Sequence, residues 1–310
     1  MPVELKPKKT TVAYYQGCSL EQMASEFDVS TRVVCDALGV ELVEIPDWSC
    51  CGSTPAHSYD PLLSAALSGR NLAIAEQQGF DVVMTPCPGC LKALKGALKV
   101  FKDPNKREAF LEILQMPFQG NIQAVSNLQL YFETIGTEAI RNRVTKPLTS
   151  LSIVPYYGCL ISRPPDFMQF DDPENPISMD RILEALGASV PEFPFKTECC
   201  GATYGVTRNE IVGKLTGRIL DMANRVGAQA IAVSCPLCQQ NLDLRQAQVN
   251  RYWRRDFHMP VLYISQFMGL AFGVEPESLG IDKLFVEADS LLDILSREGE
   301  RDQSVGGKMA

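Results

Sequence analysis

The chain has 310 residues, of which 45% are hydrophobic, and a formal net charge of −8 at pH 7. This length and apolar content predict one large or two ordinary folded domains and exclude a largely disordered chain. The acidic balance argues against nucleic acid as a partner, because a nucleic-acid-binding surface is basic. No apolar run is long enough to cross a membrane, and the amino terminus lacks the apolar core of a signal peptide. We therefore expect a soluble, cytoplasmic protein without a transmembrane segment.

The first half of the chain alternates short apolar segments, rich in β-branched and aromatic residues, with longer segments of helical periodicity. In chain order, the predicted elements are a strand within 10–18, a helix ending at Gly39, a second strand before residue 50, a helix at 62–79, a strand at 81–86, a helix at 91–101, and a further strand and helix within 121–136. This order predicts a parallel sheet with right-handed connections.

The second half repeats this order. Its predicted elements are a strand within 151–159, a helix ending at Gly187, a second strand before residue 199, a helix at 209–227, a strand at 230–236, a helix at 239–253, and a strand and helix within 259–273. We therefore expect an α/β fold of two pseudo-twofold-related, Rossmann-like domains with parallel sheets, at 1–150 and 151–297. The polar stretch 298–310 is expected to be a flexible tail.

Ten of the eleven cysteines belong to this repeat. Each half has a single cysteine after its first strand, then two adjacent cysteines followed by glycine, then a Cys-Pro-x-Cys loop after its third strand. The two matched sets are Cys18, Cys50, Cys51, Cys87 and Cys90, then Cys159, Cys199, Cys200, Cys235 and Cys238. Because ligands bind beyond the carboxyl ends of parallel strands, we expect the cysteine loops at those ends, with each set gathered at one sheet edge.

Five thiols per half suit a metal cluster better than a single ion. Structural zinc takes four ligands in a tetrahedron, and a cubane iron–sulfur cluster also takes four thiolates. Adjacent side chains such as Cys50 and Cys51 tend to diverge, so they suit an open cluster with several irons, and the glycine that follows lets the backbone pass closely. Zinc on four of the five thiols, and redox-active disulfides, stay open as alternatives. The eleventh cysteine, Cys35, aligns with Leu183 and is expected to be a buried apolar side chain.

The duplicated cysteine pattern resembles the CCG-domain (cysteine-rich) family, and within it the proteins similar to the B subunit of heterodisulfide reductase, including those of sulfur-oxidising bacteria. The resemblance covers nearly the whole chain and includes the Gly-Cys lead-in at Cys18 and Cys159. It implies that each set of five cysteines binds one noncubane [4Fe-4S] cluster, and that a disulfide is cleaved between the two clusters. It also implies an oxidoreductase acting on sulfur groups, in a complex with an iron–sulfur partner like the C subunit and a flavoprotein partner like the A subunit of that reductase.

A second function stays open, which is a non-catalytic electron-transfer protein that relays electrons to a flavin- or quinone-linked partner. The chain has neither a ferredoxin-type run of cysteines nor a nucleotide-binding glycine-rich loop, so we expect electrons to come from another protein of the complex. An accessible pocket between the clusters would favour the catalytic function.

Other polar residues are weaker candidates. His57 is a candidate ligand or proton donor, although an exposed loop histidine is the more ordinary interpretation. For Tyr15 and Tyr157, at strand ends, packing is the ordinary role and hydrogen bonding to sulfur the sharper one. The remaining polar candidates near the site are Tyr14, Gln16, Tyr156 and Tyr204. Two basic groups are expected to be solvated or to steer an anionic substrate, namely Lys92, Lys95 and Lys99, and Arg251, Arg254 and Arg255.

Overall fold

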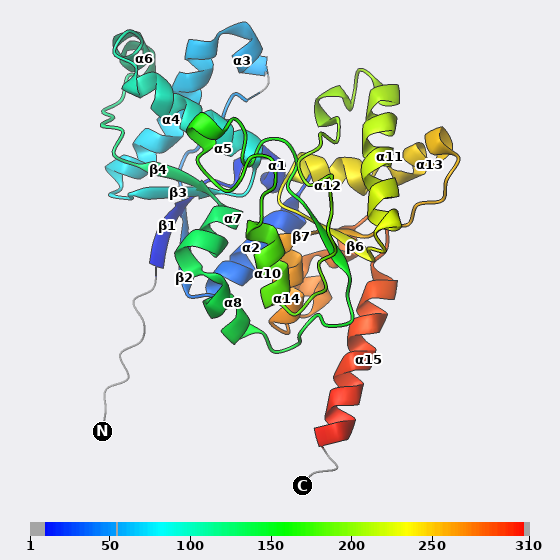
Figure 1. Cartoon of the computed structure of the whole chain (residues 1–310). Helices are drawn as coiled ribbons and strands as arrows, with labels where there is room; N and C mark the ends of the chain where they lie inside the picture. The colour runs from blue at the N-terminus through cyan, green and yellow to red at the C-terminus, as the bar shows by residue number, and fades with distance from the viewer. Residues whose placement is uncertain (1–9, 54, 307–310) are drawn as a thin grey trace, which may run out of the picture.

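The computed structural model describes residues 10–53 and 55–306, and it has two sheets whose strands are all parallel. The first sheet has the order β2-β1-β3-β4 and the second the order β5-β6-β7. Figure 1 shows the first sheet with its helices on the left and the second on the right. The predicted α/β fold, with two similar parallel-sheet units, is confirmed.

The strands are short and lie mostly in the interior. They are β1 (Thr10–Tyr14), β2 (Val40–Glu44), β3 (Val82–Thr85) and β4 (Gln123–Ser126), then β5 (Ile153–Tyr156), β6 (Ala230–Val233) and β7 (Val261–Tyr263). The second strand predicted for the second half is reduced to a single parallel bridge between Ser152 and Ser189. Pro191 and Pro194 follow this bridge, and proline supplies no N–H group with which a longer ladder could continue.

The helices of the first half include the predicted ones, in the predicted order, together with several short helices that were not predicted. They are α1 (Gly17–Glu21), α2 (Ser25–Ala37), α3 (Pro55–Tyr59), α4 (Pro61–Gln77), α5 (Pro88–Lys102), α6 (Arg107–Leu114), α7 (Asn127–Gln129), the π-helical turn η1 (Leu130–Ile135) and α8 (Thr137–Arg143). Gly39 follows α2 with a φ of 75°, as the predicted left-handed end of that helix requires.

The second half differs from prediction in one divided helix and in two helices, near residue 165 and after residue 288, that were not predicted. Its elements are α9 (Pro165–Met168), α10 (Ser178–Ala185), the 3₁₀ turn η2 (Ala202–Tyr204), α11 (Asn209–Arg225), α12 (Pro236–Leu242), α13 (Gln246–Trp253), α14 (Ile264–Ala271), the 3₁₀ turns η3 (Pro276–Leu279) and η4 (Ile281–Lys283), and α15 (Asp289–Gly306). The helix predicted over 239–253 is divided at Asp243, whose buried carboxylate accepts hydrogen bonds from the backbone of Phe285 and Val286. Of the predicted tail 298–310, α15 includes 298–306, while 307–310 lie outside the described residues.

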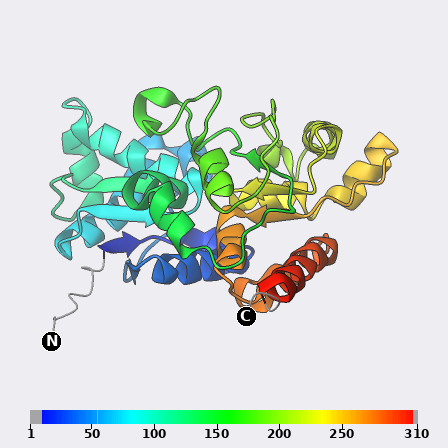
Figure 2. The same ribbon diagram turned by 60° about the horizontal axis from the view of Figure 1, so that its bottom comes forward.

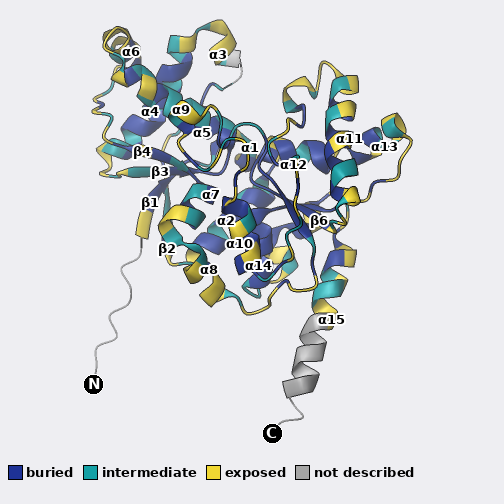
Figure 3. Ribbon diagram, in the orientation of Figure 1, coloured by how far each residue is buried: buried dark blue, intermediate teal, exposed yellow. Residues whose placement is uncertain are grey.

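Two buried clusters join the halves. One contains residues of α4, α5 and α6 from the first half together with residues of α11 and α13 from the second. The other contains residues of α2, α8, α10 and α14, and α2 packs directly against α14. Figures 1 and 2 show α2, α10 and α14 in the middle of the molecule, and Figure 3 shows that their inner sides are buried. Within the described part of the chain, no helix has the length and apolar character needed to cross a membrane.

Candidate metal centre

The five thiols of the first half meet at the carboxyl end of the first sheet. Cys18 lies on α1 after β1, Cys50 and Cys51 follow β2, and the Cys87–Cys90 loop follows β3 and opens α5. The Sγ atoms of Cys51 and Cys90 are 3.4 Å apart. Neighbouring thiols also interact, because Cys50 affects the pKa of Cys18 and of Cys51, and Cys90 affects the pKa of Cys87. The structure therefore brings all five predicted thiols into one connected group.

The second half repeats this arrangement. The Sγ atoms of Cys200 and Cys238 are 3.6 Å apart. Cys238 also interacts with Cys235, and Cys159 interacts with Cys199, since each of these contacts shifts a thiol pKa. Charge on Cys200 or Cys235 acts on Cys159 as well, so these five thiols also form one group.

Each set has a buried floor and a more open rim. The floor thiols are Cys51, Cys87 and Cys90 in the first set and Cys200, Cys235 and Cys238 in the second. Cys18, Cys50 and Cys199 are exposed, and Cys159 is half-buried. All six floor thiols belong to a single buried cluster that spans both halves. The two sets are thus connected through the interior, while each keeps two sulfur atoms near the surface.

Shared hydrogen bonds separate the pKa values within each set. The pKa of Cys51 falls to about 7, mainly because Cys90 donates to its sulfur, and the pKa of Cys90 rises for the same reason. In the second set the pKa of Cys199 falls to about 6 because Cys159 donates to it, which raises the pKa of Cys159. Since the thiolate is the form that binds metal, each set contains a sulfur suited to metal binding near neutral pH.

The donor atoms fit an iron–sulfur group. Two thiolates on one tetrahedral metal atom, each at about 2.3 Å, lie roughly 3.8 Å apart, which is close to the 3.4 and 3.6 Å separations of the floor pairs. Within residues 10–53 and 55–306, no three His, Cys, Asp or Glu side chains are arranged to hold a single metal ion. Sulfur-only donor sets favour soft metals and iron–sulfur clusters over hard cations.

A glycine precedes the first cysteine of each set and leaves room for the floor. A Cβ atom on Gly17 would lie 3.0 Å from Cys90 Sγ, and one on Gly158 would lie 3.0 Å from Cys238 Sγ. Both glycines have positive φ, at 70° and 72°, which a residue with a side chain rarely adopts. The glycine of the Gly-Cys lead-in is therefore required for two reasons: the backbone has a positive φ, and a side chain would crowd the nearby sulfur atom.

Two strand-end tyrosines hold the loops with adjacent cysteines. Tyr15 Oη donates to the carbonyl of Ser49 at 2.8 Å, and Tyr156 Oη donates to the carbonyl of Glu198 at 2.7 Å. Each carbonyl belongs to the residue just before a cysteine pair. Burial first, and then the neighbouring thiols, raise the pKa of both tyrosines, so both hydroxyls stay protonated donors.

Three further side chains, which the sequence did not single out, donate hydrogen bonds to the cysteine pairs. Ser68 donates to the carbonyl of Cys51 at 2.7 Å, and Thr216 donates to the carbonyl of Cys200 at 3.1 Å. Asn241 donates to the same carbonyl at 3.2 Å and lies 3.7 Å from Cys200 Sγ. The signal for the two hydroxyls was present, because they occupy corresponding places on the helices predicted after each cysteine pair.

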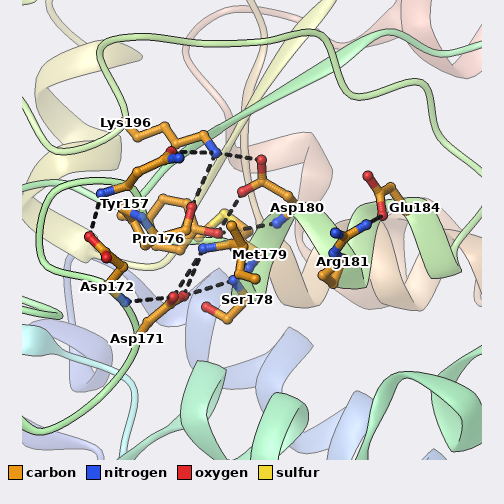
Figure 4. Close-up of polar contacts among 12 residues, drawn as sticks. Tyr157, Asp171, Asp172, Pro176, Ser178, Met179, Asp180, Arg181, Glu184 and Lys196 are labelled. Atoms are coloured by element: carbon orange, nitrogen blue, oxygen red, sulfur yellow. Dashed lines mark hydrogen bonds and ion pairs between the residues drawn. The ribbon is translucent and has the colours of Figure 1, made fainter.

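Tyr157 points away from the thiols and bonds the start of α10, on the opposite side of the strand. Its hydroxyl donates to Asp180 at 2.7 Å and accepts from the Met179 backbone at 2.6 Å (Figure 4). The buried Lys196 Nζ lies 2.6 Å from Asp180 and 3.1 Å from the Pro176 carbonyl. The Lys196 carbonyl in turn accepts from the backbone of Tyr157 and of the glycine before Cys159. This network fixes the start of the second set.

The first half has a related but more exposed network. Tyr14 Oη donates to Asp28 at 2.6 Å. Arg32 donates to Asp28 at 2.8 Å, to Gln16 at 3.2 Å and to Glu44 at 3.0 Å. Gln16, a candidate from the sequence, thus bonds an arginine on this side of the strand.

The weaker candidates lie mostly on the surface. His57 is exposed on α3, where its backbone N–H donates to the Gly52 carbonyl. Tyr204 is exposed on η2. Cys35 is fully buried, as predicted, with its sulfur 3.9 Å from Tyr131 Oη, and burial raises its pKa to about 12.

Two lysines of the predicted basic group Lys92, Lys95 and Lys99 hold the two halves together. Lys95 donates to the carbonyl of Met168, and Lys99 pairs with Asp166 at 3.2 Å. These contacts hold α9 of the second half against α5 of the first. In the arginine group, Arg255 lies 3.8 Å from an aspartate of α11.

Comparison with known proteins matches the same two regions. The family described as CCG, cysteine-rich domain, matches residues 12–95 and 153–243. The 8-methylmenaquinol:fumarate reductase membrane anchor subunit of Wolinella succinogenes is 34% identical over 282 residues, which are 90% of this chain and 98% of that protein. The B subunit of the ferredoxin:CoB-CoM heterodisulfide reductase of Methanosarcina mazei is 29% identical, over 89% of this chain and 94% of that protein.

A solved structure of a hypothetical protein from Helicobacter pylori has a similar fold, with a TM-score of 0.70 and 14% identity. The match covers 91% of this chain but 53% of that one, so this chain spans about half of its length. This likeness supports the fold alone. The names of the sequence relatives, which include reductase subunits and an iron–sulfur protein of Methanococcus maripaludis, support iron–sulfur binding and a redox role.

Proposed function

The chain belongs to the CCG cysteine-rich domain family, and from this premise we propose that it is the iron–sulfur B subunit of a heterodisulfide reductase-like complex. In this proposal each set of five cysteines holds one noncubane [4Fe-4S] cluster, and the protein catalyses disulfide/thiol redox conversion. The observation that carries the proposal is the presence of two five-thiol groups, each with three buried sulfurs and two nearer the surface.

The conversion of a disulfide to two thiols consumes two electrons and two protons. When bound, two clusters would supply one electron each, which matches this requirement. The chain's own residues would expose the site at Cys18 and Cys50 in one half and at Cys199 in the other. Tyr15 and Tyr156 would keep the paired cysteines in place, and His57 stays a candidate proton donor near the first set.

The electrons would come from partner proteins in the cytoplasm, which we propose to be an iron–sulfur protein like the C subunit and a flavoprotein like the A subunit of heterodisulfide reductase. This part of the proposal is supported by the names of the relatives, which are subunits of a ferredoxin-dependent reductase and of a quinol:fumarate reductase. The substrate would be a disulfide or another sulfur-carrying compound.

A relay of electrons to a quinone-linked partner is the second candidate. It is favoured by the relative at 34% identity, which is named as part of an 8-methylmenaquinol:fumarate reductase. A groove of about 580 Å³ beside α5 and α9 is lined by residues such as Lys95 and Phe167 and by none of the ten cysteines. That groove therefore gives no support to a disulfide pocket between the two sets.

Iron and acid-labile sulfide in protein purified without oxygen test the proposal. Two four-iron clusters predict about eight irons and a similar amount of sulfide per chain. Zinc without sulfide would overturn it. The dithionite-reduced protein is then mixed with bis(2-hydroxyethyl) disulfide or with 2,3-dimethyl-1,4-naphthoquinone. Release of thiol supports the catalytic function, whereas oxidation by the quinone alone supports the relay.

A further inference from the structure

Tyr263 lies where the two halves meet. It is the last residue of β7 and pairs with Val233 of β6, two residues before Cys235. Its ring is fully buried and stacks on Phe27 of α2, with 3.9 Å between the ring centroids and 4° between the planes. A side chain of the second half is therefore held flat against a side chain of the first.

This aromatic pair connects the two sets of thiols. Tyr263 and Phe27 belong to the same buried cluster as Cys87 of the first set and Cys235 of the second. Burial raises the pKa of Tyr263, and negative charge on Glu26, on Cys235 and on Cys87 adds to this effect. The phenol thus lies close enough to both sets to respond to their charge.

The hydroxyl of Tyr263 is buried and lacks a hydrogen-bond partner within the described residues. A buried hydroxyl left without a partner costs about 1–3 kcal/mol. Each of the four strand-end tyrosines described above, by contrast, donates its hydroxyl to an oxygen atom. The hydroxyl lies beside the Glu26 carboxyl and lowers its pKa, but the two groups do not form a hydrogen bond of standard geometry. The donor is therefore available to a bound group.

We propose that the Tyr263 hydroxyl donates a hydrogen bond to a sulfur atom of the group held by the cysteines, on the side that faces the other half. This inference rests on the proposed function, because it needs an iron–sulfur group at the site. A donor at sulfur stabilises the more negative, reduced form and so raises the reduction potential. Tyr263 is thus a tuning residue that does not itself react.

Among the described residues of the first half, the matching place is not held by a tyrosine. Ser126 takes the corresponding place at the end of β4, but its hydroxyl accepts from the Gln129 backbone at 2.9 Å and caps α7. The tuning is therefore one-sided, and it would make the two clusters differ in potential although their cysteines match.

The test is Tyr263→Phe, which keeps the ring and its stack on Phe27 and removes only the hydroxyl. We expect unchanged iron and sulfide and a lower midpoint potential for one cluster, measured by redox titration with electron paramagnetic resonance. Tyr131→Phe is the matched control, since Tyr131 is equally buried but its hydroxyl lies beside Cys35. The control is expected to leave both potentials unchanged.

An iron-loaded Tyr263→Phe protein with unchanged potentials would overturn the inference while leaving the proposed function intact. If the variant loses iron, 3,5-difluorotyrosine is placed at position 263 instead, because its more acidic hydroxyl is a stronger donor. The potential is then expected to rise, and a constant or lower value would overturn the inference. Absence of iron and sulfide from the unsubstituted protein would contradict the proposed function itself.

Discussion

The two halves place the same five thiols in the same way but support them differently. In the first half β2 pairs with β1 over five residues, whereas the second half has only the bridge between Ser152 and Ser189. The features that touch the cysteine loops occur in both halves: the lead-in glycine, the strand-end tyrosine and the helix hydroxyl. The two halves thus share the residues that position the cysteine loops. They differ in the strand pairing that lies farther from the sulfur atoms.

The difference also affects access to the thiols. Cys18 is exposed, whereas its counterpart Cys159 is half-buried. The chain that follows Cys159 docks on the first half through Lys95, which donates to the Met168 carbonyl. We infer from this that the second set is the more enclosed of the two. Variants made in matched pairs, one in each half, can separate the shared features from the different ones.

The largest effect is expected from Cys87→Ser and Cys235→Ser. Each change removes one floor thiol from one set, so each variant should keep about half of the iron. Because the surroundings of the sets differ, the paramagnetic signals that remain should differ between the two variants. Iron analysis and electron paramagnetic resonance check this.

Cys35→Ala is the control for the cysteine changes and should keep all of the iron, because Cys35 lies beside Tyr131 and outside both sets. Loss of all iron from either floor variant would show that the two sets do not bind independently. The ten cysteines would then behave as one iron site and not as two.

The second effect concerns Lys196 and Arg32, the cations that pair with the aspartates bonded by Tyr157 and Tyr14. The Lys196–Asp180 pair is buried, with side chains 11% and 15% exposed, so Lys196→Met leaves a buried carboxylate without its cation and should cost about 3 kcal/mol. In the Arg32–Asp28 pair the carboxylate is similarly buried, at 17% exposed, but the cation is more exposed, at 36%, so water already screens the pair and Arg32→Met should cost less than Lys196→Met. Urea unfolding of the iron-free proteins measures both free energies.

Equal losses of unfolding free energy in Lys196→Met and Arg32→Met would show that the different exposure of the two cations has no effect on stability. A further variant, Lys196→Met combined with Asp180→Asn, removes the unpaired charge as well. It should recover part of the lost stability, because the penalty arises mainly from the buried carboxylate.

The third effect concerns the lead-in glycines. Alanine at Gly17 or Gly158 must adopt a positive φ and also place its Cβ 3.0 Å from a floor sulfur. Gly39→Ala is the matched control, because its φ is 75° and nothing lies within 4 Å of the added atom. The control should cost roughly 1–2 kcal/mol of unfolding free energy from backbone strain alone. The lead-in variants should cost more and should also lose iron; costs no greater than the control's would contradict the close packing of sulfur on glycine.

Much of this arrangement could be predicted from the repeat itself. The order of strands and helices, the left-handed glycines after α2 and α10, and the grouping of cysteines at the strand ends all follow from pattern and from parallel-sheet topology. The bridge at Ser189 was harder to predict, because an apolar segment with two prolines still has the composition of a strand. The break at Asp243 depends on a contact with residues some forty positions later, which local periodicity does not contain.

The strand-end tyrosines show why side-chain direction was not predictable. Tyr156 and Tyr157 are adjacent, and successive residues of a strand face opposite sides. Composition does not tell which of the two faces sulfur, so Tyr157 was an equally good candidate. The structure places Tyr15 and Tyr156 with the thiols, and Tyr14 and Tyr157 with carboxylates on the other side.

The smallest effect is expected at these tyrosines. Tyr15→Phe and Tyr156→Phe each remove one hydrogen bond to the carbonyl before a cysteine pair, which is worth about 1 kcal/mol. That loss should speed the release of iron from the affected set to a ferrous chelator about fivefold, since 1.4 kcal/mol corresponds to a factor of ten. Tyr14→Phe is the control, as its hydroxyl bonds Asp28 on the opposite side of the strand. Because the two tyrosines make the same bond to the same loop position, their effects should be equal. Release that is faster in only one variant would mean that the two loops, though alike in geometry, are not equally held by this bond.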